Sequence, residues 1–311
     1  MFTNIFILAV ALYLVIKGST MATRYAGRLA ESFNLSRYTV GFIIIAIISI
    51  LPETFISITS AVSGVPEFGL GTLFGSNIAD LTLIFAIIIW YSGRSLKVES
   101  KILKNQEVYP FLLLLPVLFG LNGHLSRVEG IALIIVGASF YYMALRDGNE
   151  EGVSIPEDGG KRKNFLLLLF SMAVLLVGSH FTVTAATSVA NNLHINPILI
   201  GMLVVGVGTT MPEFFFALKS AVKKDDSLAI GDILGTVLAD ATVVVGILAV
   251  IKPFYFPIRI VYITGAFMVV ASYVLFKFMR SGRTISRREA SLLLIFWLVF
   301  AVVEFLSSYG L

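Results

Sequence analysis

The sequence contains no cysteine and only three histidines, and charged residues make up just 14% of it. Without cysteine there is no disulfide, no zinc-thiolate site, no haem attachment and no thiol catalysis. Any metal ion must therefore be held by oxygen atoms or by a histidine. Charged residues make up about a quarter of an ordinary soluble domain, so their scarcity excludes that class. The net charge of +4 gives no support to nucleic-acid binding.

Long apolar runs fill the chain instead. Hydrophobic residues make up 57% of the 311 residues, and the mean hydropathy is +0.92. A run of about 20 apolar residues is long enough to cross the hydrocarbon layer of a bilayer as a helix. The runs and their breaks predict ten helices, at residues 2–20, 38–62, 69–92, 105–122, 128–145, 164–184, 196–218, 228–251, 257–278 and 289–307. The sequence therefore predicts an all-α membrane protein with ten transmembrane helices in a lipid bilayer.

One hydrophilic stretch, residues 146–163, interrupts this pattern at mid-chain. We expect it to be a cytoplasmic linker between a first half, residues 1–145, and a second half, residues 164–311. The loops after the odd-numbered helices hold nineteen Lys and Arg residues, whereas the other loops hold three. Because basic loops stay in the cytoplasm, this predicts a multi-pass plasma-membrane protein with both termini outside. The first helix shows no basic residue before Lys17 and no clear cleavage site, so we expect it to be retained.

The two halves repeat each other at a fixed offset along the chain. Residues 14–84 align with residues 174–244 without a gap. Identical pairs include Gly18/Gly178, Gly41/Gly201, Pro52/Pro212, Glu53/Glu213, Gly71/Gly231, Gly75/Gly235, Asp80/Asp240 and Thr82/Thr242. If each half carries five spans, an odd number, equivalent helices cross the membrane in opposite directions. The sequence therefore predicts two inverted-topology repeats of five helices, which is the plan of many secondary transporters.

The repeated acids occupy positions where acids are costly. Glu53, Asp80, Glu213 and Asp240 all fall inside predicted membrane helices. A carboxylate at such a depth costs a few kcal/mol on insertion scales, so it is rare without a function. Their pairing at the repeat offset makes these four residues the leading candidates for a functional site.

Prolines and small polar residues accompany these acids. Pro52 and Pro212 remove a backbone donor inside an apolar run, which predicts broken helices and freed carbonyls near Ala46 and Gly206. Hydroxyl groups precede the prolines and line one face of the next helix with Asp80 or Asp240. These hydroxyls belong to Ser49, Thr209 and Thr210, and to Thr72, Ser76 and Thr236. Carboxylate, hydroxyl and carbonyl oxygens are the ligands of hard cations such as calcium and sodium.

Several other polar residues are given structural interpretations. Asp232 and Glu67 lie near predicted helix starts, so we expect a capping or surface role there. Glu304, near the outer end of the last predicted helix, is interpreted as an interfacial residue. The three histidines have no repeat partner and are not expected to bind metal.

At these residues the sequence resembles the cation/calcium antiporter superfamily, and most closely its prokaryotic sodium/calcium exchanger branch. The resemblance lies in Leu51-Pro52-Glu53 with residues 71–80, and in residues 208–213 with residues 231–240. It implies calcium exchanged for sodium by alternating access, with no enzymatic activity, no cofactor and no obligatory protein partner. It also implies that Glu53 and Glu213 are central calcium ligands, assisted by the hydroxyls of Ser49, Ser76, Thr209, Thr210 and Thr236 and the carbonyls of Ala46 and Gly206.

The sequence departs from the family pattern at four positions. Ile50 stands where a hydroxyl residue is usual, and Thr72, Asp80 and Asp232 stand where sodium-type exchangers often have asparagine. Close carboxylates titrate as a coupled set, so protons are a second possible cargo. A proton-coupled or potassium-assisted antiporter of calcium or another divalent cation is therefore the alternative.

Two other classes of protein could also use acids in a membrane. An intramembrane aspartyl protease needs two aspartates, but the run Ala229-Ile230-Gly231-Asp232 lacks its Gly-x-Gly-Asp element. A passive cation channel could use the same ring of acids. A channel needs no counter-ion, so a flux measurement separates it from an antiporter.

Overall fold

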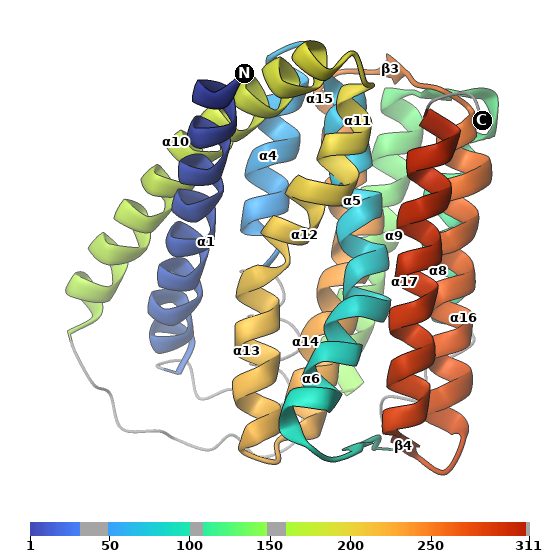
Figure 1. Cartoon of the computed structure of the whole chain (residues 1–311). Coiled ribbons are helices and arrows are strands. Elements are labelled where there is room, and N and C mark those ends of the chain that lie inside the picture. The colour runs from blue at the N-terminus through green and yellow to red at the C-terminus, as the bar shows by residue number, and fades with distance from the viewer. Residues whose placement is uncertain (32–48, 100–107, 148–159, 309–311) are drawn as a thin grey trace.

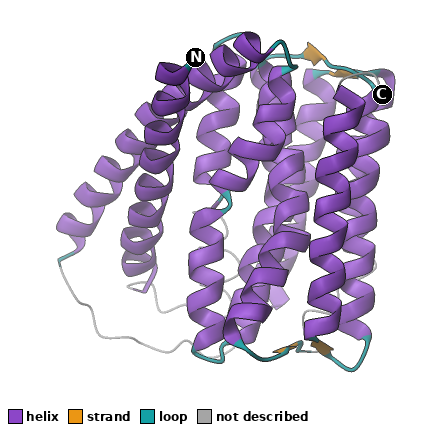
Figure 2. Ribbon diagram, in the orientation of Figure 1, coloured by secondary structure: helices purple, strands orange, loops and turns teal. Residues whose placement is uncertain are grey.

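The computed structural model describes residues 1–31, 49–99, 108–147 and 160–308 as a single helical bundle (Figure 1). Helices make up nearly all of it, and short strands lie at its two ends (Figure 2). The first half contains α1 (Phe2–Glu31), α4 (Leu51–Val62), α5 (Pro66–Ala79), the π-helical turn η2 (Asp80–Ile84), α6 (Phe85–Ser92), α8 (Val108–Phe119), the 3₁₀ turn η3 (Gly120–Asn122) and α9 (Arg127–Asp147).

The second half follows the same order of elements. It contains α10 (Lys161–Leu193), α11 (Pro197–Ile200), η4 (Gly201–Val205), α12 (Gly206–Thr209), α13 (Met211–Val222), α14 (Asp226–Ala239), η5 (Asp240–Val244), α15 (Val245–Ile251), η6 (Val261–Gly265), α16 (Ala266–Arg280) and α17 (Arg287–Ser308). The expected all-α class is confirmed. The linker assigned to residues 146–163 ends earlier than expected, because α10 begins at Lys161.

Seven helices of the described part are long and apolar enough to cross a membrane. They are Phe2–Ala22, Pro66–Ser92, Arg162–Leu193, Pro197–Val222, Asp226–Ile251, Val261–Arg280 and Arg287–Ser308. The predicted helix at 105–122 corresponds to the shorter apolar helix Val108–Asn122. The part of the predicted helix at 38–62 that precedes residue 49 lies outside the described residues. The number of ten spans therefore stays a prediction.

The repeat is visible in the element boundaries. α4 and α13 begin and end at repeat-equivalent residues, and so do α5 and α14. The turns η2 and η5 begin at the repeated acids Asp80 and Asp240. Two residues later, the hydroxyls of Thr82 and Thr242 donate to the carbonyls of Ile78 at 2.5 Å and Leu238 at 2.6 Å. The same local sequence thus gives the same widened helical turn twice.

The expected breaks near the prolines are present. α12 ends at Thr209, Thr210 forms the turn, and α13 begins at Met211 with Pro212 in its first turn. Ile50 is the corresponding turn residue before α4, and Pro52 lies in the first turn of that helix. Proline lacks the N–H that would continue the helical ladder, so the chain restarts a helix at each site.

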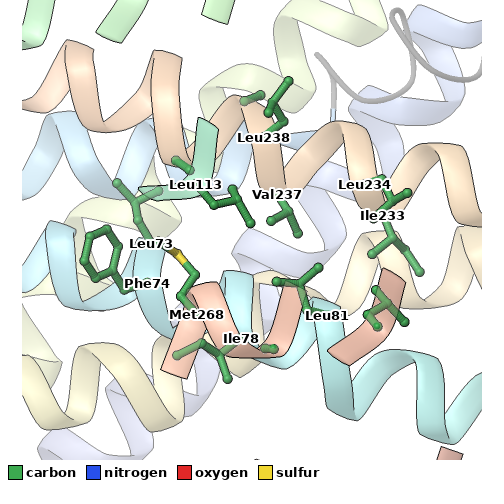
Figure 3. Close-up of a cluster of buried hydrophobic side chains, with 14 of the residues drawn as sticks. Leu73, Phe74, Ile78, Leu81, Leu113, Ile233, Leu234, Val237, Leu238 and Met268 are labelled. Atoms are coloured by element: carbon green, nitrogen blue, oxygen red, sulfur yellow. The ribbon is translucent and has the colours of Figure 1, made fainter. Parts of the chain in front are cut away.

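Between these segments lies an apolar core. Leu73, Phe74 and Ile78 come from α5, and Ile233, Leu234, Val237 and Leu238 come from α14 (Figure 3). Leu113 of α8 and Met268 of α16 join them in the same cluster. Because helices of both halves supply this core, the two halves bury their apolar surfaces against each other.

The strands tie one half of the chain to the other. β1 (Leu96–Lys97) pairs with β4 (Thr284–Ile285), and β2 (His124–Leu125) pairs with β3 (Phe254–Tyr255), both antiparallel. The two strand pairs lie at opposite ends of the bundle (Figure 2). Beside β1, the Arg94 guanidinium contacts both carboxylate oxygens of Asp226, at 2.7 and 2.5 Å, and this interaction raises the pKa of Arg94. Each end of the bundle is therefore closed by loops from both halves.

Candidate functional site

The four repeated acids are buried inside the bundle. Glu53 lies in the first turn of α4 and Glu213 in the first turn of α13. Asp80 and Asp240 lie where α5 and α14 pass into the π-helical turns. None of the four side chains is more than 1% exposed. The helix breaks and the widened turns thus place carboxylates where the chain is otherwise apolar.

The carboxylates lie near one another, and their oxygens have few partners among the described residues. Asp80 interacts electrostatically with Glu53, and Glu213 and Asp240 each interact with both of these residues. In the described part of the chain, none of the eight carboxylate oxygens accepts a hydrogen bond of normal geometry. Buried carboxylates are expected to be paired, protonated or bound to a cation. The arrangement therefore offers a site that either protons or cations can neutralise.

The acids do not form a closed metal cage as they stand. Among the residues that the structure describes, no three Asp, Glu or His side chains converge tightly enough to hold a metal ion. Other oxygen ligands would have to complete a cation site. Ala46, whose carbonyl is one of the candidates, lies outside the described residues.

The candidate hydroxyls are all buried, and most direct their proton to a carbonyl of their own helix. Ser76 donates to Leu73 at 3.0 Å and Thr210 donates to Val207 at 2.9 Å. Thr209 donates to the Gly206 carbonyl at 3.0 Å, and its side chain also interacts with the Glu53 carboxylate. Once its proton is donated, a hydroxyl oxygen still has lone pairs that can face a cation.

Two candidate oxygens differ from this pattern. The Thr236 hydroxyl has no hydrogen-bond partner among the described residues. The Gly206 carbonyl is not free as expected, because the hydroxyl of Thr209 and, at 3.3 Å, the backbone N–H of Thr210 both donate to it. It can contact a cation only when one of these donors turns away.

Asp232 is not the surface or capping residue that its sequence position suggested. It is the seventh residue of α14, with no exposed surface. Its Oδ1 accepts a hydrogen bond from the Ser49 hydroxyl at 3.2 Å, and it interacts electrostatically with Asp80 and Glu213. The expectation was wrong because α14 begins at Asp226, more than a turn before Asp232. Asp232 therefore lies in the interior with the repeated acids.

Glu304 is likewise not interfacial. It is 1% exposed on α17, where it accepts a hydrogen bond from the Thr264 hydroxyl. The Arg259 guanidinium lies 3.8 Å from its other carboxylate oxygen. Unlike the repeated acids, Glu304 has protein partners, so its burial is accounted for by structure alone.

Sequence reasoning also missed two tyrosines that contact α14. The Tyr109 hydroxyl donates to the Leu234 carbonyl at 2.7 Å, and the Tyr141 hydroxyl donates to the Gly235 carbonyl at 2.5 Å. Both phenols are buried and interact electrostatically with Asp240. In the sequence, each tyrosine is only a hydroxyl-bearing residue in an apolar helix with no tyrosine at the repeat-equivalent position, which is a weak indication of function. These bonds hold the backbone of α14 immediately before Thr236.

Asn77 is a third polar residue that the sequence did not single out. It has no exposed surface, and its Nδ2 lies 3.7 Å from the sulfur of Met268. Its Oδ1 has no partner within the described ranges. It precedes Asp80 by three residues, so both lie on similar faces of the same helix.

An apolar helical bundle with unpartnered buried carboxylates defines an integral membrane protein with an internal acidic site, which is typical of ion transporters. A sequence model of the family described as "Sodium/calcium exchanger protein" matches residues 3–146 and 163–306. The chain belongs to this family, as its motifs indicated. It is therefore a membrane exchanger of the cation/calcium exchanger superfamily.

Individual relatives cover most of the chain. Inner membrane protein YrbG of Escherichia coli (strain K12) is 27% identical over 262 residues, which are 79% of each chain. Sodium/calcium exchanger MaX1 of Methanosarcina acetivorans is 23% identical over 346 residues, covering 97% of this chain and 98% of the relative. A structure of the sodium-calcium exchanger NCX_Mj superposes with a TM-score of 0.69 at 22% identity, covering 95% of this chain and 96% of that one. This last likeness shows a shared fold.

Proposed function

We propose that this protein is a secondary antiporter that exchanges Ca²⁺ for Na⁺ across the plasma membrane by alternating access. The observation that carries the proposal is the burial of the carboxylates of Glu53, Asp80, Glu213 and Asp240, whose eight oxygens accept no hydrogen bond of normal geometry from the described residues. Cations supply the charge that this site needs. Two similar proteins, MaX1 and NCX_Mj, are named sodium/calcium exchangers. This agreement supports calcium and sodium as the cargo.

The proposed ligands are the oxygens that surround these acids. Glu53 and Glu213 act as the central calcium ligands, and Asp80 and Asp240 complete the negative charge. The hydroxyls of Ser49, Ser76, Thr209, Thr210 and Thr236 and the carbonyls of Ala46 and Gly206 make up the rest of the set. Calcium and sodium compete for the same oxygens, so one ion leaves as the other binds.

The proposed architecture is two inverted repeats of five transmembrane helices, with both termini outside. Matching element boundaries at a constant offset between the halves support the repeat. The strand pairs support the inversion, because β2 and β4 begin at repeat-equivalent residues, His124 and Thr284, and lie at opposite ends of the bundle. Equivalent loops of the two halves thus face opposite sides of the membrane. Such a pair of repeats can exchange conformations, which gives alternating access.

Occupancy would control the conformational change. An empty site leaves several negative charges in a medium of low polarity, so its passage between the two states is costly. Calcium, or several sodium ions, neutralises the carboxylates and removes that cost. The antiporter therefore changes state when loaded, and this couples the two fluxes.

Calcium uptake into proteoliposomes tests the proposal. Vesicles loaded with sodium, potassium or acidic buffer in turn are diluted into calcium-containing medium with the membrane potential clamped. We expect uptake only with an outward sodium gradient. Uptake driven by a pH gradient would identify protons as the coupling ion, and uptake driven by a potassium gradient would identify potassium. Uptake without any counter-ion would indicate a channel, and no uptake under any gradient would refute calcium as the substrate.

A further inference from the structure

Among the described residues, Asp232 is a buried acid near the site that the proposed ligand set does not use. It lies on α14 four residues before Thr236, and Asp240, four residues further on, begins η5, so the three follow one face of the helix up to the widened turn. It is as deeply buried as the four repeated acids. Thr72 holds the equivalent position in the first half, so the repeat does not explain the presence of an acid here.

Its partner is a proposed ligand from the other half of the chain. The Ser49 hydroxyl donates to Asp232 Oδ1 at 3.2 Å across 183 residues of sequence. Asp232 Oδ2 accepts no hydrogen bond from the residues described. Ser49 immediately precedes Ile50, where the chain turns into α4. The bond therefore joins α14 to the break in front of Glu53.

Ser49 differs from the other candidate hydroxyls in how its proton is placed. Thr209, which is the repeat equivalent of Ser49, donates to a carbonyl of its own helix at 3.0 Å. Ser76 and Thr210 also donate locally, three residues back. Such local bonds fix the rotation of a hydroxyl and leave its lone pairs outward. The Ser49 hydroxyl instead donates to the carboxylate of Asp232, in the opposite half.

The other half contains no such bond in its described part. Thr72, at the position equivalent to Asp232, donates to the Phe68 carbonyl of its own helix at 3.0 Å. Its hydroxyl proton is therefore used within its own helix, and Thr72 does not orient Thr209. The equivalent pair, Thr209 and Thr72, makes no such bond in the described structure, so the bond between Ser49 and Asp232 is not a requirement of the repeated fold.

We propose that Asp232 is a positioning residue, which accepts a hydrogen bond from the Ser49 hydroxyl and thereby turns the lone pairs of that hydroxyl toward the transported cation. This inference rests on the proposed function, because it takes Ser49 as a ligand. Asp232 itself does not touch the cation. What matters is an acceptor oxygen at this position, which asparagine also supplies.

The test measures cation binding to the full-length protein purified in detergent. Melting temperatures are recorded during titrations with Ca²⁺, Sr²⁺, Na⁺ and K⁺, with choline chloride as the ionic-strength control. The concentration that gives half the maximal shift is the apparent affinity. The variants are Ser49→Ala, Asp232→Ala, Asp232→Asn and the double variant Ser49→Ala/Asp232→Ala. Ser272→Ala is the matched control, since this buried serine donates only within its own helix, to the Val269 carbonyl.

We expect Ser49→Ala and Asp232→Ala each to weaken the apparent affinity about tenfold, the equivalent of one hydrogen bond to a charged group. The double variant should be no worse than either single variant. Asp232→Asn should stay within about twofold of wild type, because its carbonyl oxygen still accepts the bond. If Asp232→Ala does not fold, Asp232→Asn alone and combined with Ser49→Ala gives the same comparison.

Three results would overturn the inference while leaving the proposed function intact. These are wild-type affinity in Asp232→Ala, a loss in Asp232→Asn as large as that in Asp232→Ala, and additive losses in the double variant. The second result would instead indicate that the charge of Asp232 acts on the cation directly. A wild-type protein that no cation stabilises would refute the proposed function, and the role of Asp232 with it.

Discussion

Gly18 of α1 packs directly against Leu175 of α10, where a Cβ atom on the glycine would lie 3.0 Å from Leu175 Cγ. The reciprocal contact joins Gly178 to Val15, and both distances from its Cβ position, to the Val15 Cγ2 and backbone N atoms, are 3.0 Å. Residues 15 and 175 are repeat equivalents, as are residues 18 and 178. The two helices thus meet through a self-complementary contact, which is what a two-fold relation between the halves produces. They lie side by side at one edge of the bundle (Figure 1).

This contact predicts that a side chain at Gly18 or Gly178 will separate the two helices. Gly18→Val and Gly178→Val should each destabilise the protein by about 1–3 kcal/mol, the usual cost of overpacking. Transport should also slow, because α1 and α10 no longer fit together. The measurements are the melting temperature and the initial rate of calcium uptake. Gly160→Ala is the matched control, since nothing lies within 4 Å of its added Cβ. Equal stability of all three variants would contradict the contact.

Neutralising the central acids should abolish transport. Glu53→Gln and Glu213→Gln keep the size of the side chain but remove a charge from the proposed site. Loss of a buried charged contact costs about 2 kcal/mol or more, so the apparent calcium affinity should fall by at least about 30-fold. Calcium-dependent uptake measures the effect. Glu67→Gln, at the half-buried start of α5, is the control and should behave as wild type. Near-normal flux in either site variant would refute the ligand assignment.

The buried tyrosines should affect stability and cation affinity, because their hydroxyls hold the backbone of α14. Tyr141→Phe removes the hydrogen bond to the Gly235 carbonyl and leaves a buried carbonyl less satisfied. We expect a loss of about 1 kcal/mol in stability and a weaker cation affinity, because Thr236 follows this carbonyl directly. Tyr142→Phe is an adjacent control, since that side chain is 67% exposed. The prediction fails if thermal unfolding and cation titrations do not distinguish the two variants.

The absence of native cysteine allows a direct test of the inverted topology. Leu121 and Ser281 are exposed residues at repeat-equivalent positions, one in each half. Leu121→Cys should react with a membrane-impermeant thiol reagent from outside the cell, and Ser281→Cys only after the membrane is opened. This follows from the basic residues around Ser281, namely Lys277, Arg280 and Arg283. Labelling of both cysteines from the same side would exclude inverted repeats.

The sequence sufficed for the class of protein and for identifying four acids that the structure buries. Apolar runs fix membrane insertion because each helix must satisfy its own backbone in lipid. The repeated acids stood out because charge is costly in that environment, and the structure buries all four together. The breaks at Pro52 and Pro212 were also predictable, since the missing N–H is a local property of proline.

Helix lengths were less predictable than helix positions. α1 continues to Glu31 and α10 to Leu193, each well past the expected end. The apolar run marks only the part of a helix that lies in hydrocarbon. The backbone bonds continue through the following polar residues, because no proline stops them before those points.

By itself, the sequence determined which residues are costly to bury and where the chain repeats, since both follow from residue type and spacing. The tertiary structure decided which side chains meet. Asp232 and Glu304 both looked peripheral, yet one meets Ser49 from the other half and the other meets Thr264 and Arg259. Spacing along a helix tells which residues share a face, but not which neighbour that face contacts. That choice depends on the packing of all helices together, because close packing admits few arrangements of the same surfaces.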